Sequence, residues 1–294
     1  MKNLPLYSFQ NHMKCNMSDF SISKATFEEM KFIISQAKAE NWNPGLYDAT
    51  PFYQTDPDGF FIGTIEGDII GCISAVAYDA TFGFIGFYIV LPPYRNQGYG
   101  IQLWKHAMHY LGNRSIGLDG VITQQENYKK SGFQFYYKNI RFEGVKPYPI
   151  ATHLVDLHQM LFEKILEYDA CIWGIKRKKF LQEWIQMPNA ASLTKMHQNQ
   201  VKGYGVIRQC YNGYKIGPLF ADNLEIALEI YYGLCRFADN APVFLDVPEI
   251  NLEALKLAEK VHLHPVFETA RMYNKHPPKQ LIEKTFGVTT FELG

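Results

Sequence analysis

Three residues just after an apolar run have the types and spacing of an anion-binding turn. Arg95 is followed by Gly98 and Gly100 in the pattern R-x-x-G-x-G. Glycines let a backbone come close to a ligand, and arginine adds a fixed positive charge. A helix that begins at such a turn has backbone amides without intrahelical partners, and its dipole favours negative charge there. The pattern therefore predicts a loop that binds a pyrophosphate.

The residues on either side supply the elements that such a loop needs. Residues 84–91 form an apolar run of strand length that is rich in aromatic and β-branched side chains. Pro92 and Pro93 end this run because a proline nitrogen has no hydrogen to donate to a ladder. Apolar residues then recur at helical spacing over residues 101–111. A strand, a glycine turn and a helix are thus expected in succession.

In this setting the segment resembles the hallmark V-x-P-x-Y-R-x-x-G-x-G of the Gcn5-related N-acetyltransferase (GNAT) family. The matching residues are Val90, Pro92, Tyr94, Arg95, Gly98 and Gly100. The resemblance implies that acetyl-CoA is a co-substrate, with its pyrophosphate on the loop and its pantetheine arm along the end of the strand. The implied cofactor-binding residues are Tyr88, Ile89, Val90, Arg95, Asn96, Gln97, Gly98, Tyr99 and Gly100. The alternative interpretation is a glycine-rich turn without a ligand.

A second family motif follows the next expected strand, residues 115–121. Tyr128, Gly132 and Phe133 match Y-x-x-x-G-F, in which the family keeps a tyrosine near the thioester sulfur. The resemblance makes Tyr128 a catalytic candidate, because a phenol with a pKa of about 10 can donate to a thiolate whose thiol has a pKa of about 8.5. A tyrosine that only packs a helix end is the alternative. Many members also have an asparagine for the pantetheine arm seven residues earlier, where this chain has Val121.

The acceptor site has a weaker signal in the sequence. In the family, the loop after the first helix commonly lines the acceptor pocket. The resemblance therefore implies Trp42, Asn43 and Asp48 as substrate-binding candidates. A tryptophan that only fills the edge of the core is an equally supported interpretation of Trp42.

A primary amine that arrives protonated must lose a proton before it attacks, so a carboxylate or a chain of waters is expected near the central strands. Residues 84–91 contain no acid. Asp119, at the end of the expected strand 115–121, is therefore the first candidate for a catalytic base, followed by Asp79 and Glu126. A cap of the turn after that strand is the alternative role for Asp119.

The rest of the first half predicts an α/β (α+β) fold with a mixed, mostly antiparallel sheet flanked by helices. Thr26 and Glu29 form a capping-box pattern for a helix that ends near residue 40. Turn residues between the following apolar runs predict an antiparallel meander, and the helix after the glycine turn returns the chain to a parallel strand. The expected strands are residues 20–24, 60–65, 69–78, 84–91 and 115–121, with closing strands within 133–143.

The second half repeats this plan and loses its chemical residues. Asn251, Ala254, Leu255 and Leu257 match the family motif N-x-x-A-I-x-L, but Ala258 stands where the tyrosine is expected. This half also lacks R-x-x-G-x-G. Its expected elements are helices over 154–166, 176–187 and 223–237, a hairpin of 203–211 with 213–220, and a strand over 243–247.

The length of 294 residues exceeds the usual size of a single core and favours two domains of about 150 residues. We predict an N-terminal tail of unknown role over residues 1–17, a catalytic GNAT acetyltransferase domain over 18–145, and a second GNAT-like domain without the CoA loop over 146–294. The layout resembles bacterial tandem-domain acetyltransferases of the YitH/HolE type. The second domain is expected to complete either the acceptor cleft or a dimer surface.

Composition narrows the setting and the partners. The 29 basic and 29 acidic residues give a net charge of zero, which argues against nucleic acid as a partner. The five cysteines are odd in number and far apart, which predicts neither a disulfide framework nor a metal site. No apolar stretch reaches roughly 18 residues, and the first residues lack a signal-peptide core. A cytoplasmic protein without a membrane partner is therefore expected.

These observations together predict an acetyl-CoA-dependent N-acetyltransferase that needs no metal. The acetyl group would pass directly to a primary amine, and a small molecule is the expected acceptor. A protein lysine or N-terminus is the alternative acceptor, and a non-catalytic CoA-binding module is the alternative function. Whether the chain forms a homodimer is left open by the sequence.

Overall fold

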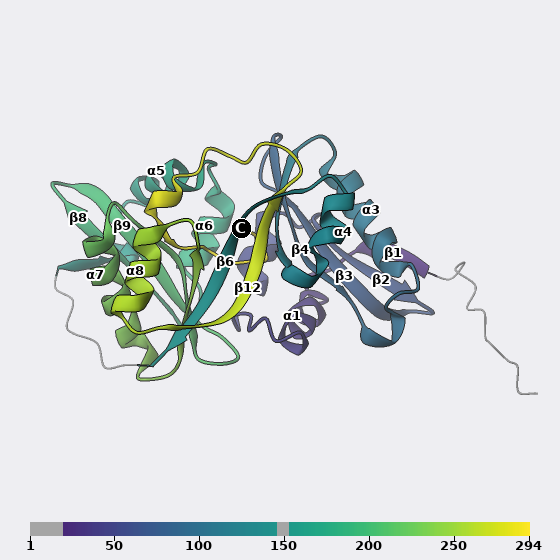
Figure 1. Ribbon diagram of the computed structural model, residues 1–294, viewed down its shortest axis with the longest axis horizontal. Coiled ribbons are helices and arrows are strands. Elements are labelled where there is room, and N and C mark those ends of the chain that lie inside the picture. Colours follow the sequence, from purple (N-terminus) through teal and green to yellow (C-terminus); the bar gives the residue numbers. More distant parts are fainter. Residues whose placement is uncertain (1–19, 146–152) are drawn as a thin grey trace, which may run out of the picture.

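The structure is a computed structural model that describes residues 20–145 and 153–294. The expected tail of residues 1–17 and the segment 146–149 of the expected domain boundary lie outside the described residues. The described chain forms one mixed sheet of 13 strands, most of them antiparallel, with helices on both faces (Figure 1). This architecture confirms the predicted fold class.

The first half follows its local sequence signals closely. Thr26 and Glu29 form the expected capping box, because the Thr26 N–H donates to the Glu29 carboxylate at 2.7 Å and the Glu29 N–H donates to the Thr26 hydroxyl at 3.3 Å. The elements are β1 (Phe20–Lys24), α1 (Met30–Ala39), α2 (Ala49–Thr55), β2 (Phe60–Ile65), β3 (Asp68–Ala77), β4 (Phe82–Val90), α3 (Tyr99–Leu111), β5 (Ser115–Val121), α4 (Gln125–Lys130) and β6 (Gln134–Gly144).

The second half departs from expectation at its start, because the helix predicted over 154–166 begins only at Phe162. Residues 154–156 instead pair with β8, and the Asp156 carboxylate accepts the His158 N–H at 2.9 Å in a tight turn. The elements are β7 (Leu154–Asp156), α5 (Phe162–Trp173), α6 (Lys178–Ile185), β8 (Ala190–His197), β9 (Gln200–Gln209), β10 (Tyr214–Ala221), α7 (Leu224–Cys235), β11 (Val243–Pro248), α8 (Leu252–Lys260), β12 (His264–Tyr273) and β13 (Thr285–Gly287).

The two halves exchange their last long strands. The strand order is β1-β2-β3-β4-β5-β12-β6-β11-β10-β9-β8-β7, with β13 beside β10. Strand β12 of the second half therefore lies between β5 and β6, and β6 of the first half lies between β12 and β11. Figure 1 shows these two strands side by side in the middle of the molecule. A boundary near residue 145 thus divides the chain but not the sheet.

A buried ion pair joins each exchanged strand to the residue directly opposite it. Arg271 on β12 lies opposite Asp119 on β5 and donates to its two oxygens at 2.8 and 2.6 Å. Arg141 on β6 lies opposite Asp246 on β11 and donates at 2.6 and 2.8 Å. Burying charges costs desolvation energy, so these bidentate pairs contribute mainly to the register of the strands.

Side chains alternate between the two faces of the sheet and form three apolar clusters. One cluster joins α1 and α2 of the first half to α5 and α6 of the second, and Phe52 stacks on Trp184 within it with ring centroids 5.9 Å apart. On the opposite face, α3 and α4 cover the first half, whereas α7 and α8 cover the second. The halves therefore share a core, which fixes residues from both around one site.

Candidate active site

A bulge in β4 and a short pairing between β4 and β5 open the sheet in the first half. Ile73 of β3 faces two residues of β4, Phe87 and Tyr88, and Phe87 has a φ of 46°. Strands β4 and β5 pair in parallel only as far as Ile85 and Leu118. Beyond these residues the two strands diverge, so that the end of β4 is free to pair with a ligand.

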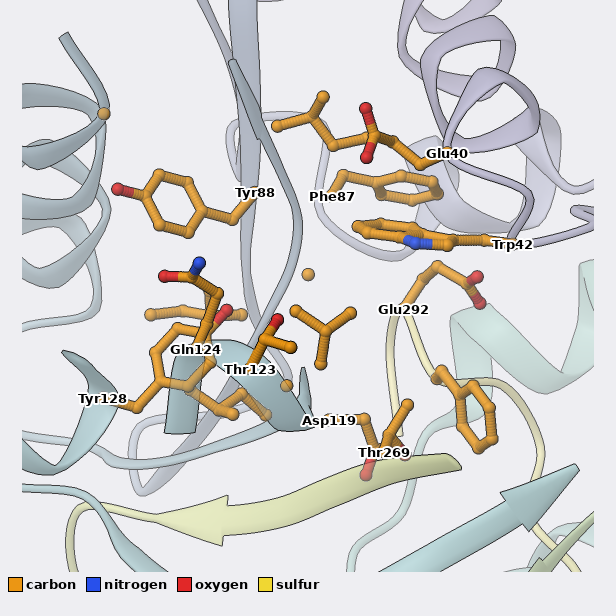
Figure 2. Close-up of a pocket in the computed structure, with 18 of the residues that line it drawn as sticks. Glu40, Trp42, Phe87, Tyr88, Asp119, Thr123, Gln124, Tyr128, Thr269 and Glu292 are labelled. Carbon is orange, nitrogen blue, oxygen red and sulfur yellow. The ribbon is translucent and has the colours of Figure 1, made fainter. Parts of the chain in front are cut away.

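A cavity of about 490 Å³ lies where β4 and β5 diverge. Its walls come from β4, the glycine loop, β5 and α4 of the first half and from β12 and the segment after β13 of the second. Figure 2 shows Tyr88, Gln124 and Tyr128 together on one side, here called the loop side. Trp42 and Glu292 lie on the other, here called the Trp42 side.

The glycine loop lies at the start of α3, as the sequence predicts. Gly98 directly precedes α3 with a φ of 87°, and a Cβ there would meet open space. Asn96 also has a positive φ, of 62°. Arg95 donates to the Val90 carbonyl at 2.7 Å and forms an ion pair with Glu40. The loop is thus anchored at the N-terminus of a helix, a geometry that fits a pyrophosphate.

Six of the nine residues predicted to bind the cofactor line this cavity. They are Tyr88, Ile89, Val90, Arg95, Asn96 and Gly100. Gln97 instead donates to the Pro93 carbonyl at 2.8 Å, and Tyr99 is buried against Phe20 with ring centroids 4.9 Å apart. Gly98, Gln97 and Tyr99 therefore belong to the turn that shapes the loop.

Tyr128 forms part of the wall on the loop side. It is 9% exposed, and its ring packs against Trp104 with centroids 5.5 Å apart. A Cβ on Gly120 would collide with this ring, so Gly120 makes room for the tyrosine beside β5. Burial raises the pKa of the Tyr128 phenol above its usual value, and the neighbouring Tyr88 adds to the shift. The hydroxyl therefore stays protonated and is a hydrogen-bond donor.

Val121 and Gln124 line the same side of the cavity. Val121 occupies the position at which many family members have an asparagine, and its side chain has no amide group. Gln124 is exposed, and Figure 2 shows its side chain between Tyr88 and Tyr128. The sequence analysis did not single out Gln124, because its spacing to Tyr128 differs from that of the motif.

Asp119, the predicted base, lines the cavity, but both of its oxygens already have partners. Arg271 donates to both oxygens, and the Asn139 side chain donates to one of them at 2.8 Å. Burial raises the pKa of the Asp119 carboxyl, while Arg271 and Asn139 act in the opposite direction. These contacts favour a positioning role. The catalytic role stays a prediction.

The two weaker candidates for the base have surface contacts. The Asp79 carboxylate accepts from the backbone N–H groups of Thr81 and Phe82 at 2.6 and 2.9 Å and so closes the turn before β4. Glu126 forms an ion pair with Lys129 one turn further along α4, with both side chains largely exposed. Neither acid is among the residues that line the cavity.

Of the three predicted acceptor residues, only Trp42 lines the cavity. The Asn43 side chain instead bridges the two halves: it donates to the Asn212 carbonyl and accepts the Asn212 N–H, both at 2.9 Å. Asp48 is buried, accepts the Gly45 N–H at 2.8 Å and forms an ion pair with Arg208. Asn43 and Asp48 therefore fix the loop that presents Trp42.

The second half supplies four further lining residues that the sequence analysis did not single out. Phe267 and Thr269 come from β12, while Phe291 and Glu292 come from the segment after β13. The exchange of strands brings β12 beside β5, and no local pattern in the sequence encodes that pairing. The only local signal is Thr290 two residues before Glu292, a spacing that suits a side-chain turn.

The equivalent opening of the second half is filled by the chain itself. Strands β10 and β11 also pair in parallel over a short stretch, which ends at Ile216 and Leu245. Strand β13 then pairs with β10, and the Val288 N–H donates to the Asp246 carbonyl at 2.8 Å. A Cβ on Gly217 would collide with the Thr289 carbonyl, which shows how closely this segment lies against β10. The same segment continues past Gly86 into the opening of the first half.

The described residues contain no group of three or more His, Cys, Asp or Glu side chains arranged to hold a metal ion. Within residues 20–145 and 153–294, no helix is both long enough and apolar enough to span a membrane.

Comparisons with known proteins agree with this architecture in both halves. Residues 27–133 match the model of the acetyltransferase (GNAT) family, and residues 165–287 match a model of an acetyltransferase (GNAT) domain. The chain is 29% identical to holothin acyltransferase of a Pseudoalteromonas species over 92% of this chain and 93% of that protein. It is 24% identical to the uncharacterized N-acetyltransferase YitH of Bacillus subtilis over 65% of this chain and 69% of that one.

Solved structures show the same fold over nearly the full length. A putative acetyltransferase from Pyrococcus horikoshii superposes with a TM-score of 0.82 at 21% identity, over 98% of this chain and 100% of that one. A tandem GNAT protein from the clavulanic acid biosynthesis pathway has a TM-score of 0.61 at 12% identity, over 86% of this chain and 98% of that one. At these identities the likeness concerns the fold alone.

Proposed function

The chain belongs to the GNAT family in both of its halves, and we propose that it transfers an acetyl group from acetyl-CoA to the primary amine of a small molecule. The observation that carries this proposal is the glycine loop at the start of α3, which borders the cavity between β4 and β5. We assign residues 18–145 as the catalytic domain and residues 146–294 as a second domain that binds no donor. The reaction would take place in the cytoplasm, where acetyl-CoA is available.

On the donor side, the loop residues and the end of β4 would hold acetyl-CoA as a substrate. The amides at the start of α3 would bind the pyrophosphate, and Arg95 would hold the loop against Val90. The diverging part of β4 leaves backbone groups for the pantetheine arm. The side-chain amide of Gln124 would take over the contact that Val121 cannot make.

On the chemical side, acetyl-CoA supplies an activated acetyl group, whose C–S bond breaks as the acceptor nitrogen bonds to the carbonyl carbon. Tyr128 would donate a hydrogen bond to the departing sulfur, because burial keeps its hydroxyl protonated. Asp119 would hold Arg271 and thereby the strand that borders the acceptor. Direct transfer needs no covalent bond to the enzyme.

The shape of the site supports a small acceptor. The cavity is lined from both halves, and Trp42 and Glu292 border it on the side away from the glycine loop. Such walls enclose an acceptor, whereas a protein lysine or N-terminus needs an open groove for the residues around it. Because both halves pack into one core, moving them apart to form a wide groove would cost packing free energy.

The direct test is the release of CoA thiol from acetyl-CoA in the presence of a panel of small amines and of lysine-containing peptides. We expect thiol release that depends on a small amine and saturates with it, and we expect the acetylated amine by mass spectrometry. Release with peptides alone would replace the small molecule by a protein acceptor. Binding of acetyl-CoA without release from any acceptor would contradict the proposed transfer.

A further inference from the structure

Glu292 differs from the other buried carboxylates of the molecule. Its residue is 3% exposed, and among the residues that the structure describes none forms an ion pair with it. The Thr290 hydroxyl hydrogen-bonds its carboxylate, and the Glu292 N–H donates to that same hydroxyl at 2.9 Å. The buried acids with an arginine partner are Asp48 with Arg208, Asp119 with Arg271, Asp169 with Arg177 and Asp246 with Arg141.

A buried carboxylate without a cationic partner is unfavourable unless a ligand supplies the cation. The positive charges of Arg141, Arg208 and Lys215 interact with Glu292 only through space. The two arginines already form ion pairs with aspartates. Lys215 is itself buried, and its ammonium has no hydrogen-bond partner among the described residues. These three cations therefore lie near Glu292 without forming an ion pair with it.

The walls around Glu292 are aromatic. Trp42, Phe87, Phe267 and Phe291 line the same cavity, and Figure 2 shows Glu292 beside Trp42. The other acids that line the cavity are already paired, Glu40 with Arg95 and Asp119 with Arg271. The Trp42 side thus combines flat apolar surfaces with a single unpaired carboxylate, an arrangement that attracts a cation through both charge and ring faces.

We infer that Glu292 binds the ammonium of the acceptor and takes its proton, and that the acceptor is a primary amine on a flat apolar body. This inference rests on the proposed acetyl transfer and names the acceptor class of that same site. In the step, the ammonium gives one proton to Glu292, and the freed electron pair forms the C–N bond. The C–S bond breaks, and the sulfur leaves with its electron pair and receives the second proton lost by the nitrogen.

The test compares two acceptors of nearly equal shape in the full-length enzyme and in Glu292→Gln. 2-Phenylethylamine is an ammonium at pH 7, whereas the amino group of O-benzylhydroxylamine is neutral there. We expect Glu292→Gln to lower kcat/KM for 2-phenylethylamine at least about 30-fold, because a buried charge loses its partner. The value for O-benzylhydroxylamine should change less than about threefold, since its nitrogen needs no carboxylate to become nucleophilic.

Two controls separate this inference from folding and from the proposed function. Glu283→Gln removes the same charge from an exposed residue just before β13 and should leave both kcat/KM values unchanged. Acetyl-CoA affinity should be equal in all three proteins. Equal losses for both acceptors, no loss for either, or a wild-type enzyme that acetylates other amines but not 2-phenylethylamine would overturn the inference alone. A wild type that acetylates no amine at all would overturn the proposed function as well.

Discussion

At the scale of single residues, the surroundings of Tyr128 determine the state of its hydroxyl. The ring rests against Trp104, and Gly120 leaves space for it at the edge of β5. The apolar surroundings raise the pKa of its phenol, which keeps the proton on the oxygen. Throughout the neutral range, Tyr128 is therefore expected to act as a hydrogen-bond donor and not as a base.

Replacement of Tyr128 by phenylalanine removes this donor and little else. We expect Tyr128→Phe to lower kcat at least about 100-fold while the Kd for acetyl-CoA changes less than about threefold. The folded pKa lies above the ordinary value of 10, so titration of Tyr128 should cause no loss of kcat at any pH below about 10. Thiol-release rates between pH 6 and 10 measure kcat and its pH dependence, and calorimetric titration measures the Kd for acetyl-CoA. An unchanged kcat would remove Tyr128 from the mechanism.

Residues of the loop and of the Tyr128 motif could be found in the sequence because their chemistry is encoded over a few consecutive positions. Arg95, Gly98 and Gly100 lie within one turn, and Tyr128 carries its own glycine four residues later. Glu292 could not be found in this way, because its position beside Trp42 depends on contacts across 250 residues of sequence. Asp119 was noticed, but its arginine partner on β12 was not.

At the scale of elements, the exchanged strands determine which residues meet at the cavity. Strand β12 brings Thr269 beside β5 and Phe267 to the cavity wall, and the pair of Arg271 with Asp119 fixes its register. A shift of one residue would turn every side chain of β12 to the opposite face of the sheet. The buried ion pair therefore positions the β12 residues that line the cavity.

Removing one partner of this ion pair should destabilise the fold more than replacing both partners with apolar residues. Asp119→Ala leaves the Arg271 guanidinium buried without an anionic partner, and we expect the free energy of unfolding to fall by about 3 to 5 kcal/mol. The double variant Asp119→Leu with Arg271→Met should recover most of this loss. Urea denaturation followed by tryptophan fluorescence measures both. Equal destabilisation of the single and double variants would contradict a mainly structural pairing.

Strand exchange also explains which elements the sequence could and could not predict. The central strand, the glycine turn and α3 were predicted correctly, because apolar periodicity and turn residues act locally. The order of β6 and β12 depends on pairing between distant segments, which periodicity does not specify. The helix expected over 154–166 failed for a local reason, since the Asp156 turn begins before the apolar residues of α5.

At the scale of the whole molecule, two copies of one fold have become unequal. In the sequence, the second half differs from the first in lacking the glycine loop and the tyrosine, and its loss of donor binding stays a prediction. The sequence could not indicate that β13 fills the opening between β10 and β11. Nor could it indicate that the next residues reach the other opening beside Gly86. One segment thus fills the opening of the second half and borders the opening of the first, an arrangement that is seen only in the folded structure.

We propose that the chain binds one donor, at the glycine loop of the first half. Calorimetric titration with acetyl-CoA measures this binding for the wild type, Gly98→Val and Gly67→Val. Gly98 and Gly67 have φ values of 87° and 89°, and each faces open space, so valine strains both backbones alike, by roughly 1 to 3 kcal/mol. Only Gly98 precedes α3.

We expect one acetyl-CoA per chain for the wild type and for Gly67→Val, with the same Kd. Gly98→Val should bind at least about tenfold more weakly, because the strained turn no longer presents the amides at the start of α3. Two acetyl-CoA molecules per chain, no binding at all, or equal affinity in Gly98→Val and Gly67→Val would contradict the account.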